Sequence, residues 1–250
     1  MDKISSRMNV AEYHKSGIHI RYDADIFSGF EEASFNSKIW AQRSAIVGFA
    51  EGRGTTFFIQ HQGRDFVLRH YQRGGLAAKF SADKYIYPGL RFTRPWREWA
   101  LLIRMLEKGL PVPVPAAIKV ERKGLLYTAD IMMLRIPGAR SLMAILMGDK
   151  LTEGYWIAIG SMIRRFHEAG VYHADLNANN IMLDEGGRCY LIDFDRCKIK
   201  KPALKWQKEN LLRLKRSLNK ISANNEVFFY VEENWRSLLR GYGWEDLKQV

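Results

Sequence analysis

Short alternating runs of apolar and polar residues dominate the first half of the chain and predict β-strands. Residues 46–59 have the pattern of a strand, a glycine-containing turn and a second strand, and residues 66–71 have that of a third. Tight turns between consecutive strands favour an antiparallel meander. Weaker patterns predict a strand over residues 13–22 and a short helix over residues 27–40. Further strands are expected at residues 116–120 and 125–134.

Helical spacing appears once in this half and then dominates the second half. Trp99, Leu102 and Leu106 recur at helical intervals after Pro95, which suits the first turn of a helix that ends near Gly109. Beyond residue 139, most apolar residues recur at helical spacing. The helices expected there span residues 142–147, 152–169, 207–221 and 226–239, and short strands are expected around 180–183 and 188–192.

These patterns predict an α+β fold with two lobes. Residues 1–135 would form an N-lobe of antiparallel sheet plus one helix, and residues 136–250 a mainly helical C-lobe, with Ile-Pro-Gly-Ala at 136–139 as the hinge. Apolar types make up 47% of the residues, which is enough for a hydrophobic core and excludes a disordered chain. The apolar runs are far shorter than the roughly 18–20 residues of a membrane-spanning helix. The two cysteines exclude a disulfide framework.

The balance of charges points to an anionic partner. Lys and Arg number 39 against 27 Asp and Glu, which gives a formal net charge of +12. Charge of this size says little about fold, but it favours binding to nucleic acid, to a phosphorylated small molecule or to a negatively charged membrane.

The strongest functional pattern lies in the C-lobe. His173, Asp175 and Asn180 have the spacing His-x-Asp-x-x-x-x-Asn, and Asp193-Phe194 follow thirteen residues after Asn180. Phosphoryl transfer needs a carboxylate that accepts the proton of the attacking hydroxyl, and a carboxylate and an amide oxygen that hold divalent metal against the phosphates. Asp175 is therefore the candidate base, and Asn180 and Asp193 are the candidate metal ligands.

Each of these residues has a structural explanation when it is taken alone, because aspartate and asparagine commonly cap turns and follow strands. The joint spacing, with apolar strands on both sides, favours a catalytic role for the set. His173 is interpreted differently, as a structural hydrogen-bonding residue.

A second pattern in the N-lobe is less specific. Gly48, Gly52 and Gly54 lie between two expected strands, where backbone N–H groups can cover phosphates. Arg69 on the third strand and Glu98 near the start of the long helix would then be a phosphate-binding cation and its carboxylate partner. Taken separately, these are a glycine-bearing hairpin, a surface arginine and a first-turn helix acid.

The order of these features resembles the protein-kinase-like superfamily, over residues 46–196. Three departures matter: Arg69 stands in place of a lysine, the catalytic loop reads His-Ala-Asp, and the third motif reads Asp-Phe-Asp with Asp195 in place of glycine. No Ala-Pro-Glu follows, so there is no room for the segment that lays out a peptide substrate. The hydroxyl of a small molecule or a glycolipid is the expected acceptor.

The details resemble the 3-deoxy-D-manno-octulosonic acid (Kdo) kinases, which belong with the lipopolysaccharide core kinases of Gram-negative bacteria. The similar segments cover nearly the whole chain, and in this family an arginine on strand three and Asp-Phe-Asp are the normal pattern. They are Gly-Arg-Gly-Thr-Thr at 52–56, Val-Leu-Arg-His-Tyr at 67–71, Ala-Asp-Leu-Asn at 174–177, Leu-Ile-Asp-Phe-Asp-Arg at 191–196 and the Asn210–Leu218 helix.

This resemblance implies a reaction and a place for it. ATP with Mg²⁺ would phosphorylate the 4-hydroxyl of Kdo on a Kdo-lipid A precursor. The enzyme would be a peripheral protein at the cytoplasmic face of the inner membrane, and nucleic acid would not be a partner. Residues 196–220 hold ten Lys or Arg and one acid, and residues 69–104 hold eight against two acids. Such runs are usually solvated faces, but here they would dock phosphorylated lipid A and anionic headgroups. The aromatic loop at 85–92 would contact the lipid or sugar, or else pack in the core.

Two alternatives stay open from the sequence. One is a kinase for another core sugar, such as heptose, or for a protein. The other is a non-catalytic module whose basic faces bind lipid or nucleic acid, which would show salt-dependent binding without consumption of ATP.

Overall fold

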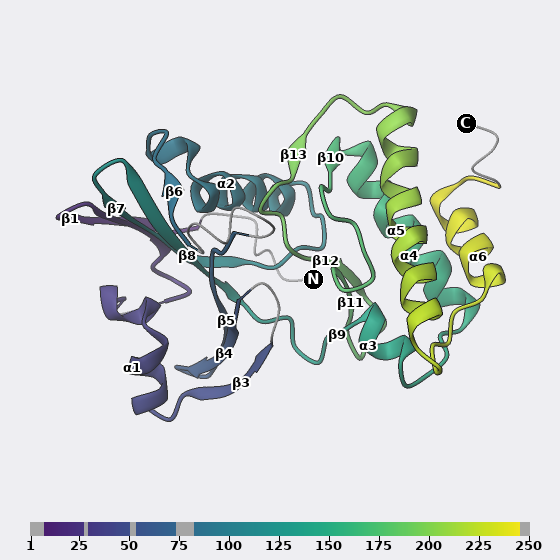
Figure 1. Ribbon diagram of the computed structural model, residues 1–250, viewed down its shortest axis with the longest axis horizontal. Helices are drawn as coiled ribbons and strands as arrows, with labels where there is room; N and C mark the ends of the chain where they lie inside the picture. The colour runs from purple at the N-terminus through teal and green to yellow at the C-terminus, as the bar shows by residue number, and fades with distance from the viewer. Residues whose placement is uncertain (1–7, 28–29, 51–53, 74–82, 246–250) are drawn as a thin grey trace. The chain divides into compact units, whose positions relative to one another are not determined.

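The computed structural model describes residues 8–27, 30–50, 54–73 and 83–245, and it divides into two compact units. The first unit contains residues 1–103 and 113–135, and the second contains residues 104–112 and 136–250. Figure 1 shows a sheet-rich first unit and a mainly helical second unit. Among the residues described, no helix has both the length and the apolar character that crossing a bilayer requires.

An antiparallel sheet forms the first unit. Its strands follow the order β1-β2-β7-β8-β5-β4-β3, and β6 pairs with β8. The expected meander of three consecutive strands is confirmed as β3, β4 and β5. The strands are β1 (Val10–Lys15), β2 (Ile18–Asp23), β3 (Ile46–Ala50), β4 (Thr56–His61), β5 (Arg64–His70), β6 (Tyr85–Ile86), β7 (Pro115–Lys123) and β8 (Leu126–Leu134).

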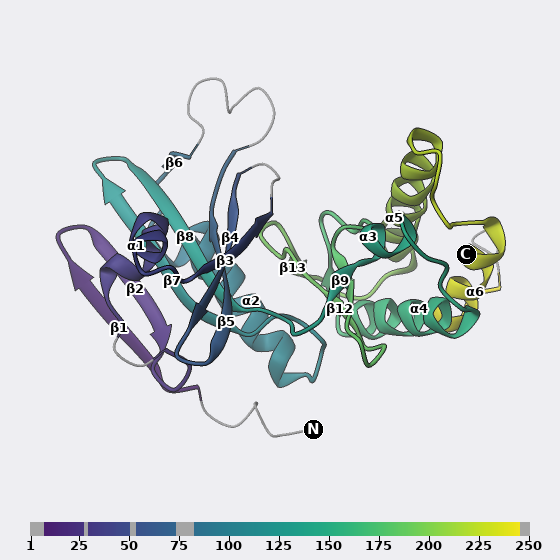
Figure 2. The same cartoon turned by 90° about the horizontal axis from the view of Figure 1, so that it is seen from below.

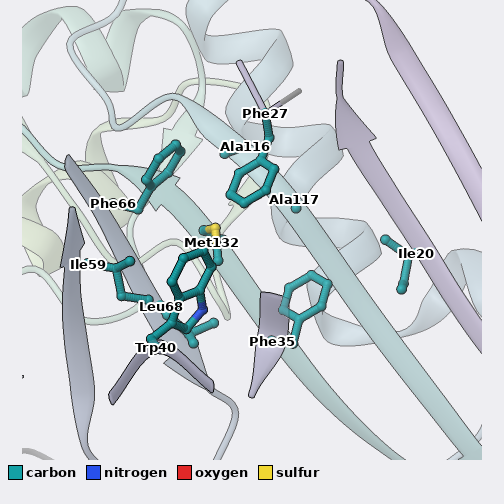
Figure 3. Close-up of a cluster of buried hydrophobic side chains, with 10 residues drawn as sticks. All are labelled: Ile20, Phe27, Phe35, Trp40, Ile59, Phe66, Leu68, Ala116, Ala117 and Met132. Atoms are coloured by element: carbon teal, nitrogen blue, oxygen red, sulfur yellow. The ribbon is translucent and has the colours of Figure 1, made fainter. Parts of the chain in front are cut away.

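Helices cover the two faces of this sheet. Side chains alternate along β5, so Phe66 and Leu68 point to one face while Arg69 points to the other. The first face packs against residues 27–40, which include the 3-10 helix η1 (Glu32–Phe35) and continue into α1 (Ser37–Gln42). Figure 3 shows this core, in which Trp40 lies close to β4 and β5. The other face carries Arg69 toward α2 (Arg94–Glu107), which follows the short 3-10 helix η3 (Leu90–Phe92).

The described part of the second unit is built from the helices α3 to α6 and short strands. Its two small sheets pair β10 with β13, and order the other three strands as β12-β11-β9. The apolar stripe predicted for the second helix is confirmed, because Trp156, Ile159, Ile163 and Phe166 are all buried. The elements are β9 (Arg140–Ser141), α3 (Leu142–Leu146), α4 (Glu153–Glu168), β10 (Val171–Tyr172), β11 (Ile181–Leu183), β12 (Cys189–Leu191), β13 (Lys198–Ile199), α5 (Leu204–Asn224) and α6 (Glu232–Tyr242).

The predicted α+β class, with an antiparallel sheet and a helical second half, is confirmed, but three local predictions are wrong. The single strand expected at 13–22 is the hairpin β1–β2, because Ser16 and Gly17 adopt positive φ and reverse the chain. The helix expected over 27–40 is reduced to η1 and the start of α1. The last helix begins at Glu232 rather than 226, because the N–H of Phe229 donates to the carbonyl of Leu146 at 2.8 Å.

Candidate active site

A tight loop between β10 and β11 carries the candidate base. Its own asparagines close it: the Nδ2 groups of Asn177 and Asn180 donate to the backbone carbonyl of Asp175 at 3.0 and 2.9 Å. The side-chain oxygen of Asn177 accepts from the N–H groups of Asn179 and Asn180 at 2.8 and 3.3 Å. The backbone of the loop is therefore held in one shape, while the carboxyl of Asp175 remains 42% exposed to solvent.

His173 links this loop to the next strand. Its Nε2 lies 3.0 Å from the carbonyl oxygen of Ile192, and its Nδ1 accepts from the N–H of Asp175 at 3.2 Å. Both contacts fit a neutral imidazole that is protonated on Nε2. Burial is the main cause that lowers the pKa of His173, against the carboxylates of Asp193 and Asp175, which raise it. The histidine is placed as a neutral structural residue, in the role that the sequence indicated.

Asp193 follows β12 and lies in the same unit. It has φ of +64°, a conformation that few non-glycine residues adopt and that is typical of functional loops. The N–H of Ile192 donates to the carbonyl of Asn180 at 3.0 Å, so the two strand ends that bear Asn180 and Asp193 are joined directly. The structure thus brings Asp175, Asn180 and Asp193 together around His173.

The described residues contain no cluster of three or more His, Cys, Asp or Glu side chains that could hold a metal ion by themselves. A magnesium site does not need one, because Mg²⁺ is usually held by one or two carboxylates together with substrate phosphates and water. Asp193 and the amide oxygen of Asn180 fit that requirement, since the Nδ2 of Asn180 is already bonded to the loop.

One face of α5 supports the catalytic loop, a role that the sequence did not assign to this helix. The Oδ1 of Asn210 accepts from the N–H of His173 at 3.2 Å, and the Oγ of Ser217 accepts from the N–H of Ala178 at 3.3 Å. Between them, a guanidinium nitrogen of Arg213 lies 3.6 Å from the carboxylate of Asp175. Their spacing of three and four residues places all three side chains on one side of the helix. That spacing was visible in the sequence, but nothing local indicated which loop the helix would meet.

Cys197 is a further residue whose role sequence reasoning missed. Its sulfur is buried and accepts from the N–H of Ala174 at 3.3 Å, and its own N–H donates to the carbonyl of Phe194 at 3.0 Å. This thiol therefore connects the loop of Asp175 with the segment that follows Asp193.

In the first unit, Arg69 and Glu98 form the ion pair that the sequence predicts. A terminal nitrogen of Arg69 lies 2.8 Å from both carboxylate oxygens of Glu98, which is 1% exposed. The hydroxyl of Tyr71 donates to the same carboxylate at 2.5 Å. Burial, followed by the charge of Glu98, raises the pKa of Tyr71 well above its usual value, so the phenol stays protonated as a donor. Glu98 is thereby fixed, and it holds Arg69 in one orientation from α2.

The structure describes two of the three glycines that were predicted to cover phosphates. Gly48 lies inside β3 rather than between the strands, and a Cβ there would come 3.2 Å from the ring of Phe58. Gly54 precedes β4, and a Cβ there would come 2.6 Å from the side chain of Gln72. Gly52 lies outside the described residues.

Comparisons with known proteins identify the family of the chain. The model of the lipopolysaccharide kinase (Kdo/WaaP) family matches residues 37–242. A 3-deoxy-D-manno-octulosonic acid kinase of Photobacterium damsela subsp. piscicida is 39% identical over 223 residues, which cover 89% of this chain and 92% of that protein. A protein of the same name from Mannheimia succiniciproducens is 42% identical over 219 residues, which cover 85% and 90%.

A solved structure, that of the Cydia pomonella granulovirus kinase PK-1, is similar at a TM-score of 0.44 and 13% identity, over 68% of this chain and 58% of that one. The family rests on the sequence matches, and the match to the family model extends over residues of both units. They confirm the resemblance that the motifs indicated. The chain therefore belongs to the lipopolysaccharide kinase (Kdo/WaaP) family and is a phosphotransferase.

Proposed function

We propose that this kinase uses ATP to phosphorylate the 4-hydroxyl of Kdo on a Kdo-lipid A precursor, in synthesis of the lipopolysaccharide inner core. The observation that carries the proposal is the convergence of Asp175, Asn180 and Asp193 in one unit, in a chain about 40% identical to proteins named Kdo kinase. The two units are taken as the N-lobe and the C-lobe of a kinase.

Asp175 is the proposed base. The hydroxyl oxygen of the sugar attacks the γ-phosphorus of ATP, a new P–O bond forms, and the bond between the γ-phosphorus and the β–γ bridging oxygen breaks to release ADP. The proton of the hydroxyl passes to the carboxylate of Asp175. Two features support this role: the carboxyl is 42% exposed, and its backbone is fixed by Asn177 and Asn180.

Asn180 and Asp193 are the proposed ligands of Mg²⁺. The bonded Nδ2 of Asn180 leaves the side-chain oxygen to bind the ion, and the unusual backbone of Asp193 supports a functional role for its carboxylate. An ion held there would neutralise negative charge on the phosphates.

Arg69 is the proposed ligand of the ATP phosphates, with Glu98 positioning it. Gly48, Gly52 and Gly54 are proposed to let the backbone approach the phosphates closely. Support comes from the buried ion pair, because a carboxylate that is itself held by Tyr71 fixes the direction of the guanidinium group.

The acceptor is anchored in a membrane, so we place the enzyme at the cytoplasmic face of the inner membrane as a peripheral protein. The anionic partner expected from the net charge of +12 is then the phosphorylated glycolipid together with the membrane surface, and not nucleic acid.

The test uses the purified chain, Mg²⁺, radiolabelled ATP and Kdo-lipid A precursor. We expect label on the Kdo 4-hydroxyl, by mass spectrometry and NMR of the product, and a fall of about 10³-fold or more in rate for Asp175→Ala. Asp149→Ala, which removes an exposed carboxylate outside the site, is the matched control. Undiminished transfer by Asp175→Ala would refute the assignment of the base. Phosphate found on heptose, or on a protein, would refute the choice of acceptor.

A further inference from the structure

One end of the sheet in the first unit carries exposed apolar side chains. Ile86 of β6 and Leu126 of β8 are paired directly across the ladder and are 74% and 39% exposed. Leu125, in the turn of the β7–β8 hairpin, is 81% exposed, and Phe92 of η3 is 67% exposed. In Figure 2, β6 lies beside the end of that hairpin. We call these four residues the apolar tip.

Exposed cations accompany the apolar tip. They come from the same three segments: Lys84 from the start of β6, Arg91 from η3, and Arg122 and Lys123 from the end of β7. The nearby acids are already engaged, because Glu121 lies 2.7 Å from the Nζ of Lys123 and Asp83 lies 3.4 Å from His70. The tip thus combines apolar side chains with a surplus of positive charge.

The backbone holds this end of the sheet in a defined shape. The N–H of Tyr87 donates to the carbonyl of Leu125 at 2.9 Å, and the Nε of Arg122 donates to the carbonyl of Gly124 at 2.9 Å. Gly124 has φ of +62°, which suits the two-residue turn that presents Leu125. The guanidinium group of Arg122 also lies 4.6 Å from the ring centre of Tyr87. A hydrogen-bonded turn of defined shape therefore exposes Leu125 and its neighbours.

We propose that the apolar tip docks on the surface of a bilayer that contains anionic phospholipid. Ile86, Phe92, Leu125 and Leu126 enter the boundary between headgroups and acyl chains, and the four cations contact lipid phosphates. Charge complementarity selects this partner, because large apolar side chains ringed by lysine and arginine are the composition of peripheral membrane-binding surfaces. The inference builds on the proposed function, since a kinase with a lipid-anchored acceptor must work at a membrane.

The experiment measures sedimentation of the full chain with vesicles, in the absence of ATP and lipopolysaccharide. Vesicles of phosphatidylethanolamine with about 30% phosphatidylglycerol by moles provide an anionic surface. Vesicles of phosphatidylcholine alone provide a surface without net charge for comparison. We expect binding to the anionic vesicles, and a loss of about tenfold or more in affinity for the double variant Phe92→Ser, Leu125→Ser. Arg91→Gln with Lys123→Gln should weaken binding to the anionic vesicles in the same direction.

The matched control is Val227→Ser, at a valine between α5 and α6 that is 53% exposed. It should bind vesicles as the wild type does. Three results would overturn the proposal: equal binding to both vesicle types, loss of binding in Val227→Ser but not in the tip variant, or binding only when lipid A is added. The last would mean that the tip recognises the substrate itself. Vesicle binding without phosphorylation of Kdo would refute the proposed function and leave this inference standing.

Discussion

Arg213 places a positive charge beside the proposed base, from a helix that follows the catalytic loop in the chain. Its guanidinium lies 3.6 Å from the carboxylate of Asp175, and both side chains are close to half exposed. A cation beside the proposed base can stabilise negative charge that develops on a transferring phosphoryl group. The same contact orients the carboxylate of Asp175.

We therefore expect Arg213→Gln to lower kcat by about 10- to 100-fold while the KM for ATP changes little. Steady-state kinetics with the Kdo acceptor measure this. Arg236→Gln removes an arginine of α6 that is more exposed than Arg213 and pairs with Glu233 on its own helix, and it should keep wild-type kinetics. An unchanged kcat in Arg213→Gln would show that the contact with Asp175 is incidental.

His70 connects two acids on the face of the sheet that α1 covers. Its Nδ1 lies 2.7 Å from Asp130 and its Nε2 lies 3.4 Å from Asp83, while Lys119 shares Asp130 at 3.1 Å. The hydrogen bond with Asp130 is the main cause that raises the pKa of His70. A raised pKa in the folded state means that protonation stabilises the fold.

That stabilisation is complete below the unfolded pKa of about 6.5 and is lost as the pH rises through the higher pKa of the folded state. His70→Gln should therefore lower the free energy of unfolding more at pH 5.5 than at pH 9, relative to the wild type. Urea denaturation at the two pH values measures the difference. A loss of the same size at both would mean that His70 acts only through its neutral hydrogen bonds.

Among the helices, α4 and α6 pack unusually closely, and glycines on both make this possible. A Cβ at Gly160 of α4 would lie 1.9 Å from the carbonyl oxygen of Leu238, and one at Gly241 of α6 would lie 2.0 Å from that of Ile157. Contacts this short with backbone atoms cannot be relieved by a side-chain rotation. The two helices would have to separate, which would disturb the contact between His167 of α4 and the hydroxyl of Tyr242 at 2.8 Å.

Gly160→Ala should therefore lower the free energy of unfolding by about 2–3 kcal/mol, the upper part of the usual cost of overpacking. Gly154→Ala is the control in the same helix, because the nearest atom to its added Cβ is the Oγ1 of Thr152 at 3.9 Å. It should be neutral or slightly stabilising, since alanine favours helix over glycine. Chemical denaturation compares the two variants, and equal stability would contradict the packing argument.

The same elements explain what the sequence could and could not predict. The catalytic loop was predictable because Asp175 and Asn180 belong to one short segment whose spacing is local. Helix α4 was predictable because its apolar residues recur at helical intervals. The start of α6 was not, because the contact of Phe229 with Leu146 is tertiary. The contacts of Asn210, Arg213 and Ser217 with the catalytic loop were not predictable for the same reason, because they depend on which loop α5 packs against.

At the scale of the whole molecule, the cations behind the net charge of +12 fall into two groups with different proposed roles. Some cations belong to the proposed chemistry, as Arg69 and Arg213 do. Others accompany exposed apolar residues at the apolar tip, where they suit a lipid surface. Composition alone could not separate these, because the total charge carries no information about which cations lie beside a carboxylate and which lie beside leucine.

The proposed site also predicts how ATP should affect the stability of the whole chain. In the proposed function, Arg69 binds the phosphates of ATP and Asp193 binds the Mg²⁺ that accompanies them. A ligand that binds only the folded state stabilises it by about 2.7 kcal/mol at a concentration of 100 Kd. For a chain of this size that corresponds to a rise of about 5–10 °C in Tm.

We expect this rise in the wild type when ATP and Mg²⁺ are added together, measured by thermal unfolding, and a much smaller one with ATP alone. Asp193→Asn should reduce the rise by weakening the metal site, and Arg69→Gln should reduce it by weakening phosphate binding. Asp149→Asn, at an exposed carboxylate, should keep the full rise. A reduced rise in both site variants would support the proposed roles of Asp193 and Arg69. A full rise in either one would remove that residue from the nucleotide site.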